Sequence, residues 1–186
     1  MKAIIEAPAE IRQRIWMELS RAALDRHHEW RTPVLATVGL DGAPNARTVV
    51  LRHADAQALT LGFYTDARSP KIAELAEQPQ AKLLFWSTRL NWQLRVRVRV
   101  ATLTSGPQVE AVWAKVKQSR AAGDYLTLRA PGQPLADDVS MAVNNHAPHH
   151  LALLNAQVDE IDWLELSRNG HRRARLSATT WDWLTP

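Results

Sequence analysis

The stretch from Asn91 to Thr104 constrains the fold more than any other part of the chain, because its apolar and cationic residues alternate strictly. The alternating positions are Leu94, Arg95, Val96, Arg97, Val98, Arg99 and Val100. Successive side chains of a β-strand point to opposite faces, so this period of two predicts a strand with one apolar and one cationic face. Gln93 shares parity with the arginines and is expected on the polar face. For Arg97 and Arg99, a solvated outer strand is at least as good an explanation as a ligand site.

The other elements follow from spacing and turn signals. Apolar residues at helical intervals predict an N-terminal helix from about Pro8 to His28. Asp41-Gly42 is a hairpin turn signal between two β-like runs. The predicted strands are 33–40, 45–52, 59–65, 81–87, 91–104, 156–166, 172–177 and 181–184, and the predicted further helices are 69–77 and 107–120. Six or seven mostly antiparallel strands with few helices predict a mainly β fold, a small closed β-barrel with flanking helices.

Length and composition favour one domain, predicted over residues 1–186. Apolar residues make up 46% of the 186 residues, which is enough for a full core. We expect the N-terminal helix within 1–30 and a lid-like insertion over 121–150, where Gly, Pro, Asp and His recur. No run reaches the roughly 18 apolar residues of a membrane span, and the N-terminus carries no secretory pattern. With no cysteine in the chain, we expect a cytoplasmic protein without a membrane partner.

The net charge of +4 raises the question of nucleic acid. The cationic residues are dispersed among strands, and the tryptophans are spaced far apart, so neither a basic stripe nor a stacking platform is present. We therefore predict no nucleic-acid partner. The excess of cations fits a phosphorylated ligand instead.

Two successive strand ends carry the residues that such a ligand needs. Arg47 to Arg52 forms the first segment, and Phe63 to Lys71 forms the second, which opens directly into a helix. Helix N-terminal amides together with Ser69 and Lys71 predict a receptacle for a phosphate dianion. Arg47 and Arg52 differ in parity, so either a bulge intervenes or Arg52 lies beyond the strand end.

With these motifs in order, the sequence resembles the pyridoxamine 5'-phosphate oxidase-like family of FMN-binding split β-barrels, in its oxidase-related branch of unsettled substrate. The resemblance runs from about Pro33 to Ser119 and again from Ile161 to the end. Its motifs, each weak alone and specific in their order, are Ala36 to Pro44, Arg47 to Arg52, Phe63-Tyr64-Thr65, Ser69-Pro70-Lys71, Ala81 to Trp86, Gln93, Lys117-Gln118-Ser119, Trp163, His171, Arg173 and Leu184-Thr185-Pro186.

The resemblance implies FMN as cofactor and a homodimer that holds it. Residues expected to hold or flank the flavin from one chain are Arg47, Thr48, Val49, Val50, Leu51, Arg52, Tyr64, Thr65, Ser69, Lys71 and Gln93. Residues expected to arrive from the second subunit are Gln118, Ser119, Trp163 and Arg173. His171 is the candidate catalytic residue, for orienting a substrate. Among these, Ser69 and Lys71 are expected at the phosphate, and Gln93 at the polar edge of the ring system.

The sequence also departs from the family's true oxidases. Their Tyr-Phe-x-x-Arg-Pro-x-x-Ser segment for the substrate phosphate is replaced by Ser105 to Trp113, which has neither that Tyr nor that Arg. The oxidases' Lys on the second strand is Arg52 here, and their Arg-x-His becomes Asn169-Gly170-His171. A bound dianion without cations carries a severe desolvation cost. We therefore expect an FMN-dependent oxidoreductase of another small organic molecule rather than a pyridoxamine-phosphate oxidase.

Alternative functions stay open at this point. One is an FMN-binding carrier, sensor or stress protein without turnover, and another is the same barrel holding a deazaflavin or haem. His146, His149 and His150 suggest a metal, but no acidic ligand accompanies them at close spacing and Pro148 prevents a helical pair, so no metal site is predicted. Trp86, Trp92 and Trp113 are expected to be packing residues.

Overall fold

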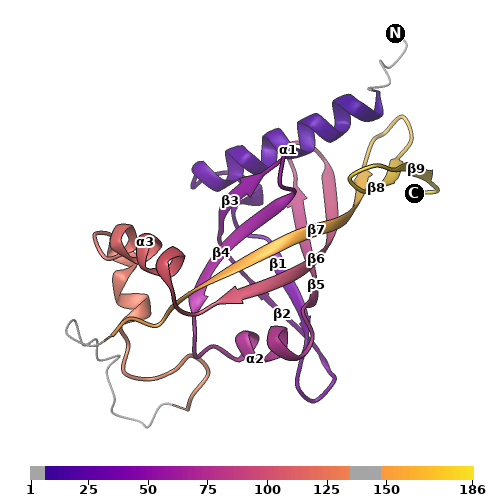
Figure 1. Cartoon of the computed structure of the whole chain (residues 1–186). Coiled ribbons are helices and arrows are strands. Elements are labelled where there is room, and N and C mark those ends of the chain that lie inside the picture. Colours follow the sequence, from indigo (N-terminus) through magenta and orange to yellow (C-terminus); the bar gives the residue numbers. More distant parts are fainter. Residues whose placement is uncertain (1–6, 135–147) are drawn as a thin grey trace.

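The computed structural model describes residues 7–134 and 148–186. Over these residues nine strands form one antiparallel sheet in the order β2-β1-β5-β6-β7-β4-β3, with β8 on β7 and β9 on β8 (Figure 1). The strands are β1 Val34–Val38, β2 Pro44–Thr48, β3 Leu51–Asp55, β4 Thr60–Asp66, β5 Gln80–Ser87, β6 Trp92–Leu103, β7 Leu151–Glu165, β8 Arg172–Leu176 and β9 Trp181–Leu184. The helices are α1 Pro8–Leu24, α2 Pro70–Glu77 and α3 Pro107–Val116, with 3₁₀ turns η1 Glu29–Arg31 and η2 Arg120–Tyr125.

The sheet closes on itself because its two ends are neighbours in the chain. The first and last strands of the order, β2 and β3, are separated by only Val49 and Val50. So short a connection forces the two edges together, and the sheet curls into a barrel. The predicted mainly β barrel with flanking helices is confirmed. Nine strands are described where six or seven were expected for the barrel. The eight segments predicted as strands become nine because one of them, 45–52, is two strands.

That strand is 45–52, which breaks between β2 and β3. β2 pairs with β1, whereas β3 pairs with β4 through a register shift between Leu51 and His53. Arg52 occupies this bulge. Of the two explanations for the different parity of Arg47 and Arg52, the bulge is therefore correct, and a strand break lies between the two residues as well. Arg47 and Arg52 therefore belong to different strand pairs.

The alternation in β6 is confirmed. Leu94, Val96 and Val98 are fully buried in the barrel core, and the intervening arginines face outward. The cationic face is paired with acids of β7 rather than left to solvent alone: Arg95 binds Asp162, and Arg97 lies 3.5 Å from Glu160.

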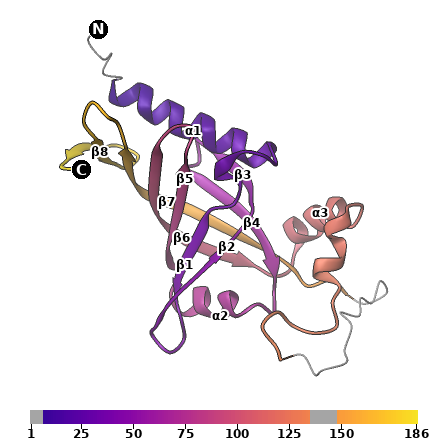
Figure 2. The ribbon, with the colours of Figure 1, turned by 180° about the vertical axis from the view of Figure 1, so that it is seen from behind.

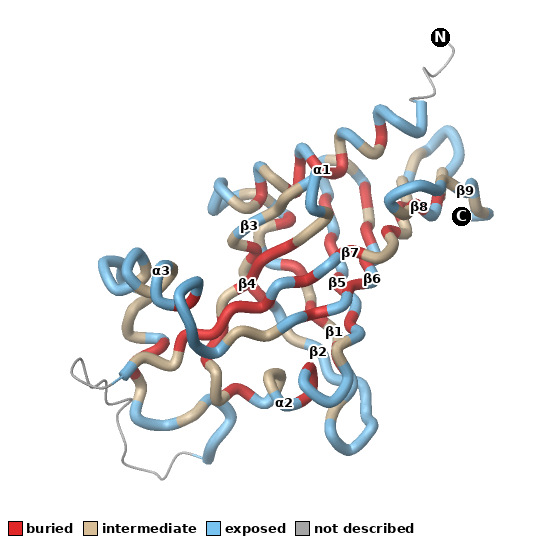
Figure 3. The backbone as a smooth tube through the Cα atoms, viewed as in Figure 1, coloured by how far each residue is buried: buried red, intermediate tan, exposed pale blue. Residues whose placement is uncertain are grey.

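The N-terminal helix closes one end of the barrel, as both ribbon views show (Figures 1 and 2). Its predicted apolar stripe is buried, with Ile11, Ile15 and Leu19 fully inaccessible, and the red positions of Figure 3 line its inner side. The helix ends at Leu24 instead of His28, because Asp25 adopts an extended conformation. Trp30 of η1 then inserts into the core, edge-on to Phe85 at 6.0 Å between ring centroids.

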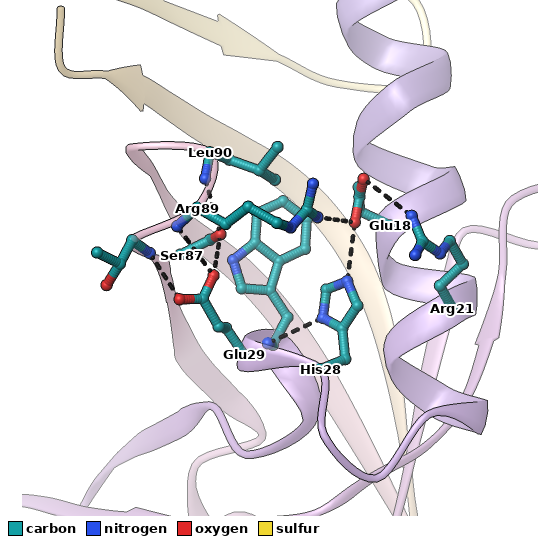
Figure 4. Close-up of polar contacts among 9 residues, drawn as sticks. Glu18, Arg21, His28, Glu29, Ser87, Arg89 and Leu90 are labelled. Carbon is teal, nitrogen blue, oxygen red and sulfur yellow. Dashed lines mark hydrogen bonds and ion pairs between the residues drawn. The ribbon is translucent and has the colours of Figure 1, made fainter.

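A buried carboxylate fastens α1 to the barrel (Figure 4). Glu18 Oε2 accepts from His28 Nε2 at 2.8 Å and from Arg89 at 2.6 Å. The His28 Nδ1 atom accepts the Trp30 backbone N–H at 3.1 Å, so the ring proton lies on Nε2 and is donated to Glu18. Burial alone would raise the pKa of Glu18, but the bond from His28 and the charge of Arg89 bring it below its usual value.

A second carboxylate binds the same turn between β5 and β6. Glu29 accepts from the hydroxyl of Ser87 and from the backbone amides of Thr88 and Arg89 at 3.1 and 3.2 Å (Figure 4). The segment from α1 to η1 is thus held to the β5–β6 turn by two acidic side chains.

Strand β7 begins at Leu151, five residues before the predicted start. Leu151 to Leu154 are all buried, so the period-two signal is absent there. One face of this run packs in the barrel, and the other meets Val109 of α3 and Tyr125 of η2. Helix α3 is shorter than predicted and ends at Val116. Part of the predicted lid, 135–147, lies outside the described residues.

Candidate functional site

Lys71 stands at the start of α2 between two hydroxyl groups. Its Nζ donates to Thr65 Oγ1 at 2.9 Å and to Ser69 Oγ at 2.5 Å. Ser69 is the N-cap residue of α2, yet its side chain makes no capping bond. Within residues 7–134 and 148–186, Lys71 forms no ion pair. The ammonium is therefore oriented by hydroxyls and left without a partner anion.

Arg47 approaches the same place from β2. Its guanidinium donates to Glu74 Oε2 at 2.8 Å and to the hydroxyl of Thr37. The Thr37 hydroxyl in turn donates to Glu74 Oε2 at 2.6 Å, and Asn45 donates to Oε1 at 2.7 Å. We call Arg47, Thr65, Ser69 and Lys71 the cationic corner.

The electrostatics of the cationic corner favour an anion. Burial lowers the pKa of Lys71, and the nearby charge of Arg47 lowers it further, while Glu74 and Asp66 oppose the shift. Asp66 is already bound by Arg68 at 2.7 Å. Glu74 is likewise bound by Arg47 at 2.8 Å, so among the described residues no unpaired acid stands beside Lys71. An anion bound there would relieve the repulsion between Lys71 and Arg47.

Arg52 and Tyr64 lie elsewhere than the cationic corner. Phe63 and Thr65 of β4 face the barrel interior, so Tyr64 faces the other side and packs with α3. The Arg52 guanidinium carbon lies 5.5 Å from the centroid of the Tyr64 ring. Its Nε atom is buried without a hydrogen-bond partner. The bulge thus turns Arg52 to the outside of β4, away from the cationic corner, and its expected contact with the flavin stays a prediction.

The remaining residues of the Arg47–Arg52 segment take three environments. Thr48 is exposed, Val49 and Leu51 are buried, and Val50 is intermediate. The Val49 amide donates to Pro33 O at 3.0 Å, which holds the β2–β3 break in place.

Gln93 and Arg173 share the outward side of the sheet. Cross-strand partners run from Trp86 through Gln93 and Leu164 to Arg173, a row across β5, β6, β7 and β8. The next row holds Leu84, Arg95, Asp162 and Arg175. We call these two rows the outer face. Trp86 and Leu84 are 43% and 40% exposed there, although large apolar side chains are normally covered.

Arg173 is not a free cation. Its guanidinium donates twice to Asp162, at 3.0 and 2.8 Å, and Arg95 binds the same carboxylate. Gln93, in contrast, makes no side-chain hydrogen bond with any described residue. The outer face therefore presents the free amide of Gln93 beside Arg95 and Arg173, whose charges are partly neutralised by Asp162.

Trp163, which is expected beside the flavin of a second subunit, is buried within its own chain. It pairs with Leu94 and Ala174 on the inward side of the sheet and has no exposed surface. Its ring stacks edge-on against Trp92 at 5.3 Å. Since Arg173 points outward and Trp163 inward, the two cannot contact one ligand from the same side of the sheet.

His171 and the pair Gln118–Ser119 lie at opposite ends of β7, as the positions of β8 and α3 show (Figures 1 and 2). His171 is exposed, and its Nδ1 accepts the Ser167 amide at 3.1 Å. It lines a surface hollow of about 700 Å³ with Asn91 and Arg168. Gln118 and Ser119 are exposed, and their side chains donate to Ala114 O and Val116 O, while the Ser119 hydroxyl also accepts the Ala121 amide at 3.3 Å. One chain alone does not bring these predicted residues together.

Sequence reasoning missed the supports of the cationic corner, namely Thr37, Asn45 and Glu74. The signal available was a helix with an acid one turn after Lys71, and Thr37 and Asn45 facing each other across the Asp41-Gly42 turn. Nothing in the sequence linked that helix to that hairpin.

Metal ligands and membrane helices are absent from the described part of the chain. No group of three or more His, Cys, Asp or Glu side chains is placed to hold a metal there. His149 stacks on Trp113 at 4.5 Å and meets Glu110 at 3.3 Å, whereas His146 lies outside the described residues. Over residues 7–134 and 148–186, every helix is too short or too polar to cross a bilayer.

Comparison with known proteins gives the following matches. Residues 13–104 match the family model described as pyridoxamine 5'-phosphate oxidase, FMN-binding domain. A pyridoxine/pyridoxamine 5'-phosphate oxidase of Myxococcus xanthus is 38% identical over 103 residues, 55% of this chain and 48% of that protein. One of Thermosynechococcus vestitus is 44% identical over 71 residues, 38% of this chain and 33% of that protein. The chain thus spans about half or less of these relatives.

Solved structures extend the likeness over the whole fold. A pyridoxamine 5'-phosphate oxidase-related, FMN binding protein of Nostoc punctiforme superposes with a TM-score of 0.71 at 21% identity, covering 98% of this chain and 100% of that one. PhzG of Burkholderia lata, solved with tetrahydrophenazine-1-carboxylic acid, has a TM-score of 0.70 at 19% identity, with 98% and 95% coverage. At such identities the likeness establishes the fold.

Proposed function

This chain belongs to the family of pyridoxamine 5'-phosphate oxidase FMN-binding domains, and from that premise we propose that it is a homodimeric, FMN-dependent oxidoreductase acting on a small organic substrate in the cytoplasm. FMN, the cofactor predicted from the sequence, is the cofactor of the family's domain. The residues that hold it, the dimer and the reaction are the proposal.

The observation that carries the proposal is the cationic corner. A phosphate dianion needs cations and hydrogen-bond donors. Lys71 supplies an ammonium that no described acid neutralises, and Arg47 supplies a second positive charge beside it. Both lie within the matched segment 13–104. The donor set therefore fits the phosphate of FMN.

Bound FMN supplies two-electron redox chemistry, so the protein needs to bind and orient rather than to abstract a proton with a strong base. Gln93 offers an amide without an internal partner, which suits the polar edge of the flavin ring. His171 lines an exposed hollow and would orient the substrate.

A second copy of the chain would bring the separated residues together. Within one chain, α3 with Gln118 and Ser119 lies far along β7 from β8 with Arg173 (Figures 1 and 2). The outer face carries exposed Trp86 and Leu84 beside Gln93. Burying these two apolar side chains against a partner is favourable, and it would place the partner beside Gln93.

Pyridoxamine 5'-phosphate is not the substrate that we propose. By the resemblance, the segment from Ser105 to Trp113 stands where the oxidases carry their substrate-phosphate residues. Most of it belongs to α3, whose inner residues are Val109, Val112 and Trp113. Its cations, Lys115 and the following Lys117, are exposed. Helix α3 itself therefore offers no inward cation to a second phosphate.

The test begins with purified protein titrated with FMN and weighed in solution by light scattering. We expect one FMN per chain in a dimer. Reduction of the bound flavin by NADH or NADPH, or by candidate amines, is then followed by loss of visible absorbance, with oxygen uptake as the second readout. Oxidation of pyridoxamine 5'-phosphate at rates typical of an enzyme would overturn the substrate proposal. Bound flavin that no reductant reduces would favour the non-catalytic carrier or sensor.

A further inference from the structure

We propose that Glu74 is the positioning residue that holds Arg47 in place for the phosphate of the bound flavin. This inference rests on the proposed function and adds a residue that the sequence analysis did not include. Glu74 would not touch the cofactor. It would act through Arg47.

The carboxylate of Glu74 is fully occupied by donors from two strands. Oε1 accepts from Asn45 at 2.7 Å, and Oε2 accepts from Thr37 at 2.6 Å and from Arg47 at 2.8 Å. The residue is 4% exposed, so water does not replace these partners. Glu74 thereby ties α2 to the β1–β2 hairpin.

This tie fixes the spacing of the two cations. Lys71 and Glu74 are three residues apart on α2, one turn of the helix, while Arg47 is carried by β2. Without Glu74, nothing described holds the Arg47 guanidinium to α2. Thr37 completes the arrangement, because its hydroxyl accepts from Arg47 and donates to Glu74.

With the Asn45 amide oriented as it is, only a carboxylate satisfies this set of donors. Asn45, Thr37 and Arg47 all donate, and a carboxylate has acceptor sites on both oxygens. Glutamine would turn an NH₂ group towards one of these donors. Burial would raise the pKa of Glu74, but the bonds from Thr37 and Asn45 and the charge of Arg47 lower it, so the acid stays ionised near neutral pH.

A role of Glu74 as a countercharge and a role in positioning Arg47 predict opposite changes in FMN affinity for Glu74→Gln. If Glu74 were merely a countercharge, Glu74→Gln would leave the cationic corner more positive and tighten the binding of a dianion. If Glu74 positions Arg47, Glu74→Gln removes the charge that holds the guanidinium and weakens the binding of FMN. The direction of the change therefore distinguishes the two roles.

The experiment measures the dissociation constants of FMN and riboflavin for the wild-type protein, Glu74→Gln and Thr37→Val, with Glu77→Gln as the matched control. Glu77 is exposed at the end of the same helix. We expect Glu74→Gln to weaken FMN about tenfold or more and riboflavin little, since riboflavin lacks the phosphate. Thr37→Val keeps the charge and the shape, and should weaken FMN by a smaller factor of about three to ten. Glu77→Gln should bind FMN as the wild type does.

Unchanged or tighter FMN binding by Glu74→Gln would overturn the inference while leaving the proposed function intact. An equal loss for riboflavin and FMN would overturn it too, because it would show general damage to the barrel. If Glu74→Gln does not fold, Thr37→Val alone decides: wild-type affinity for FMN in that variant contradicts the positioning role. A wild-type protein that binds no FMN would instead refute the proposed function.

Discussion

The ammonium of Lys71 donates to the hydroxyl of Ser69 at 2.5 Å, although Ser69 is the N-cap of the helix that Lys71 belongs to. An N-cap serine normally accepts from a backbone amide of the first turn. Here the hydroxyl is turned to Lys71 and makes no such bond, so the first turn of α2 has no side-chain acceptor. A phosphate oxygen at this place would take that role as well as the charge.

Ser69→Ala tests that arrangement. Loss of a working N-cap costs about 1 kcal/mol of unfolding free energy. Because Ser69 makes no capping bond, we expect the unfolding free energy of the cofactor-free protein to fall by less than about 0.5 kcal/mol. FMN affinity should fall about threefold to tenfold, since Lys71 loses one of its two anchors. Chemical denaturation and FMN titration measure the two quantities. A fall of about 1 kcal/mol in unfolding free energy together with unchanged FMN affinity would show that Ser69 acts as an ordinary N-cap and does not orient Lys71.

FMN affinity should depend on the ionisation of Lys71. Burial and the charge of Arg47 lower the pKa of Lys71 below its usual 10.5. FMN prefers the charged ammonium, so affinity should fall as pH rises through this lowered pKa, and binding above it should take up a proton. The unfolding free energy of the cofactor-free protein should change with pH in the opposite direction. Between the lowered pKa and 10.5 the unfolded chain binds more protons than the folded protein, so the unfolding free energy rises with pH. Titrations at constant ionic strength, with riboflavin correcting for the ring's own ionisation, measure the effect. A Lys71→Gln variant with the same alkaline loss would exclude Lys71 as its source.

The contact between Glu18 and His28 should contribute to stability far from the cofactor. His28→Ala removes a donor from a carboxylate whose side chain is 3% exposed, and should cost about 1–3 kcal/mol. The exposed neighbour His27, changed to Ala, should cost much less. Because the pKa of Glu18 is lowered from 4.5, its contribution is present above that value and is lost as pH falls through the lower folded pKa. Urea unfolding at neutral and acidic pH measures both effects. Equal losses for the two histidine variants would show that α1 is not fastened in this way.

The outer face should be the dimer contact. Trp86→Glu places a charge on that face, and we expect it to give monomers that bind FMN at least tenfold more weakly. Leu24→Glu is the control, because Leu24 is 88% exposed at the end of α1. Light scattering and FMN titration of both variants provide the measurement. A dimeric Trp86→Glu with unchanged affinity would locate the interface elsewhere.

The elements predicted from sequence were those whose signal is local. The alternation of β6 from Leu94 to Val100 reflects one apolar and one polar face, so burial on one side is enough to reveal it. The start of α2 is likewise indicated by three consecutive residues, Ser69-Pro70-Lys71. Both predictions agree with the structure.

What sequence could not predict depends on contacts between distant elements. β7 starts five residues early because Leu151 to Leu154 are covered on both faces, which removes the period of two. Arg52 lies away from the cationic corner because of a bulge, and the position of that bulge is set by the pairing of β3 with β4. Trp163 lies inward because it pairs with Leu94 across the sheet, and the sequence of its own strand does not show that pairing. Glu74 meets Arg47 only because α2 packs under the β1–β2 hairpin.

The most direct test of the account is the ratio of FMN to riboflavin affinity in the wild-type protein and in Lys71→Gln. If the cationic corner binds the phosphate, the wild type should prefer FMN by at least about a hundredfold, a difference of about 2.7 kcal/mol. Lys71→Gln should lose about tenfold or more of that preference while its riboflavin affinity stays the same. Equal binding of FMN and riboflavin by the wild type, or an unchanged preference in Lys71→Gln, would contradict the account.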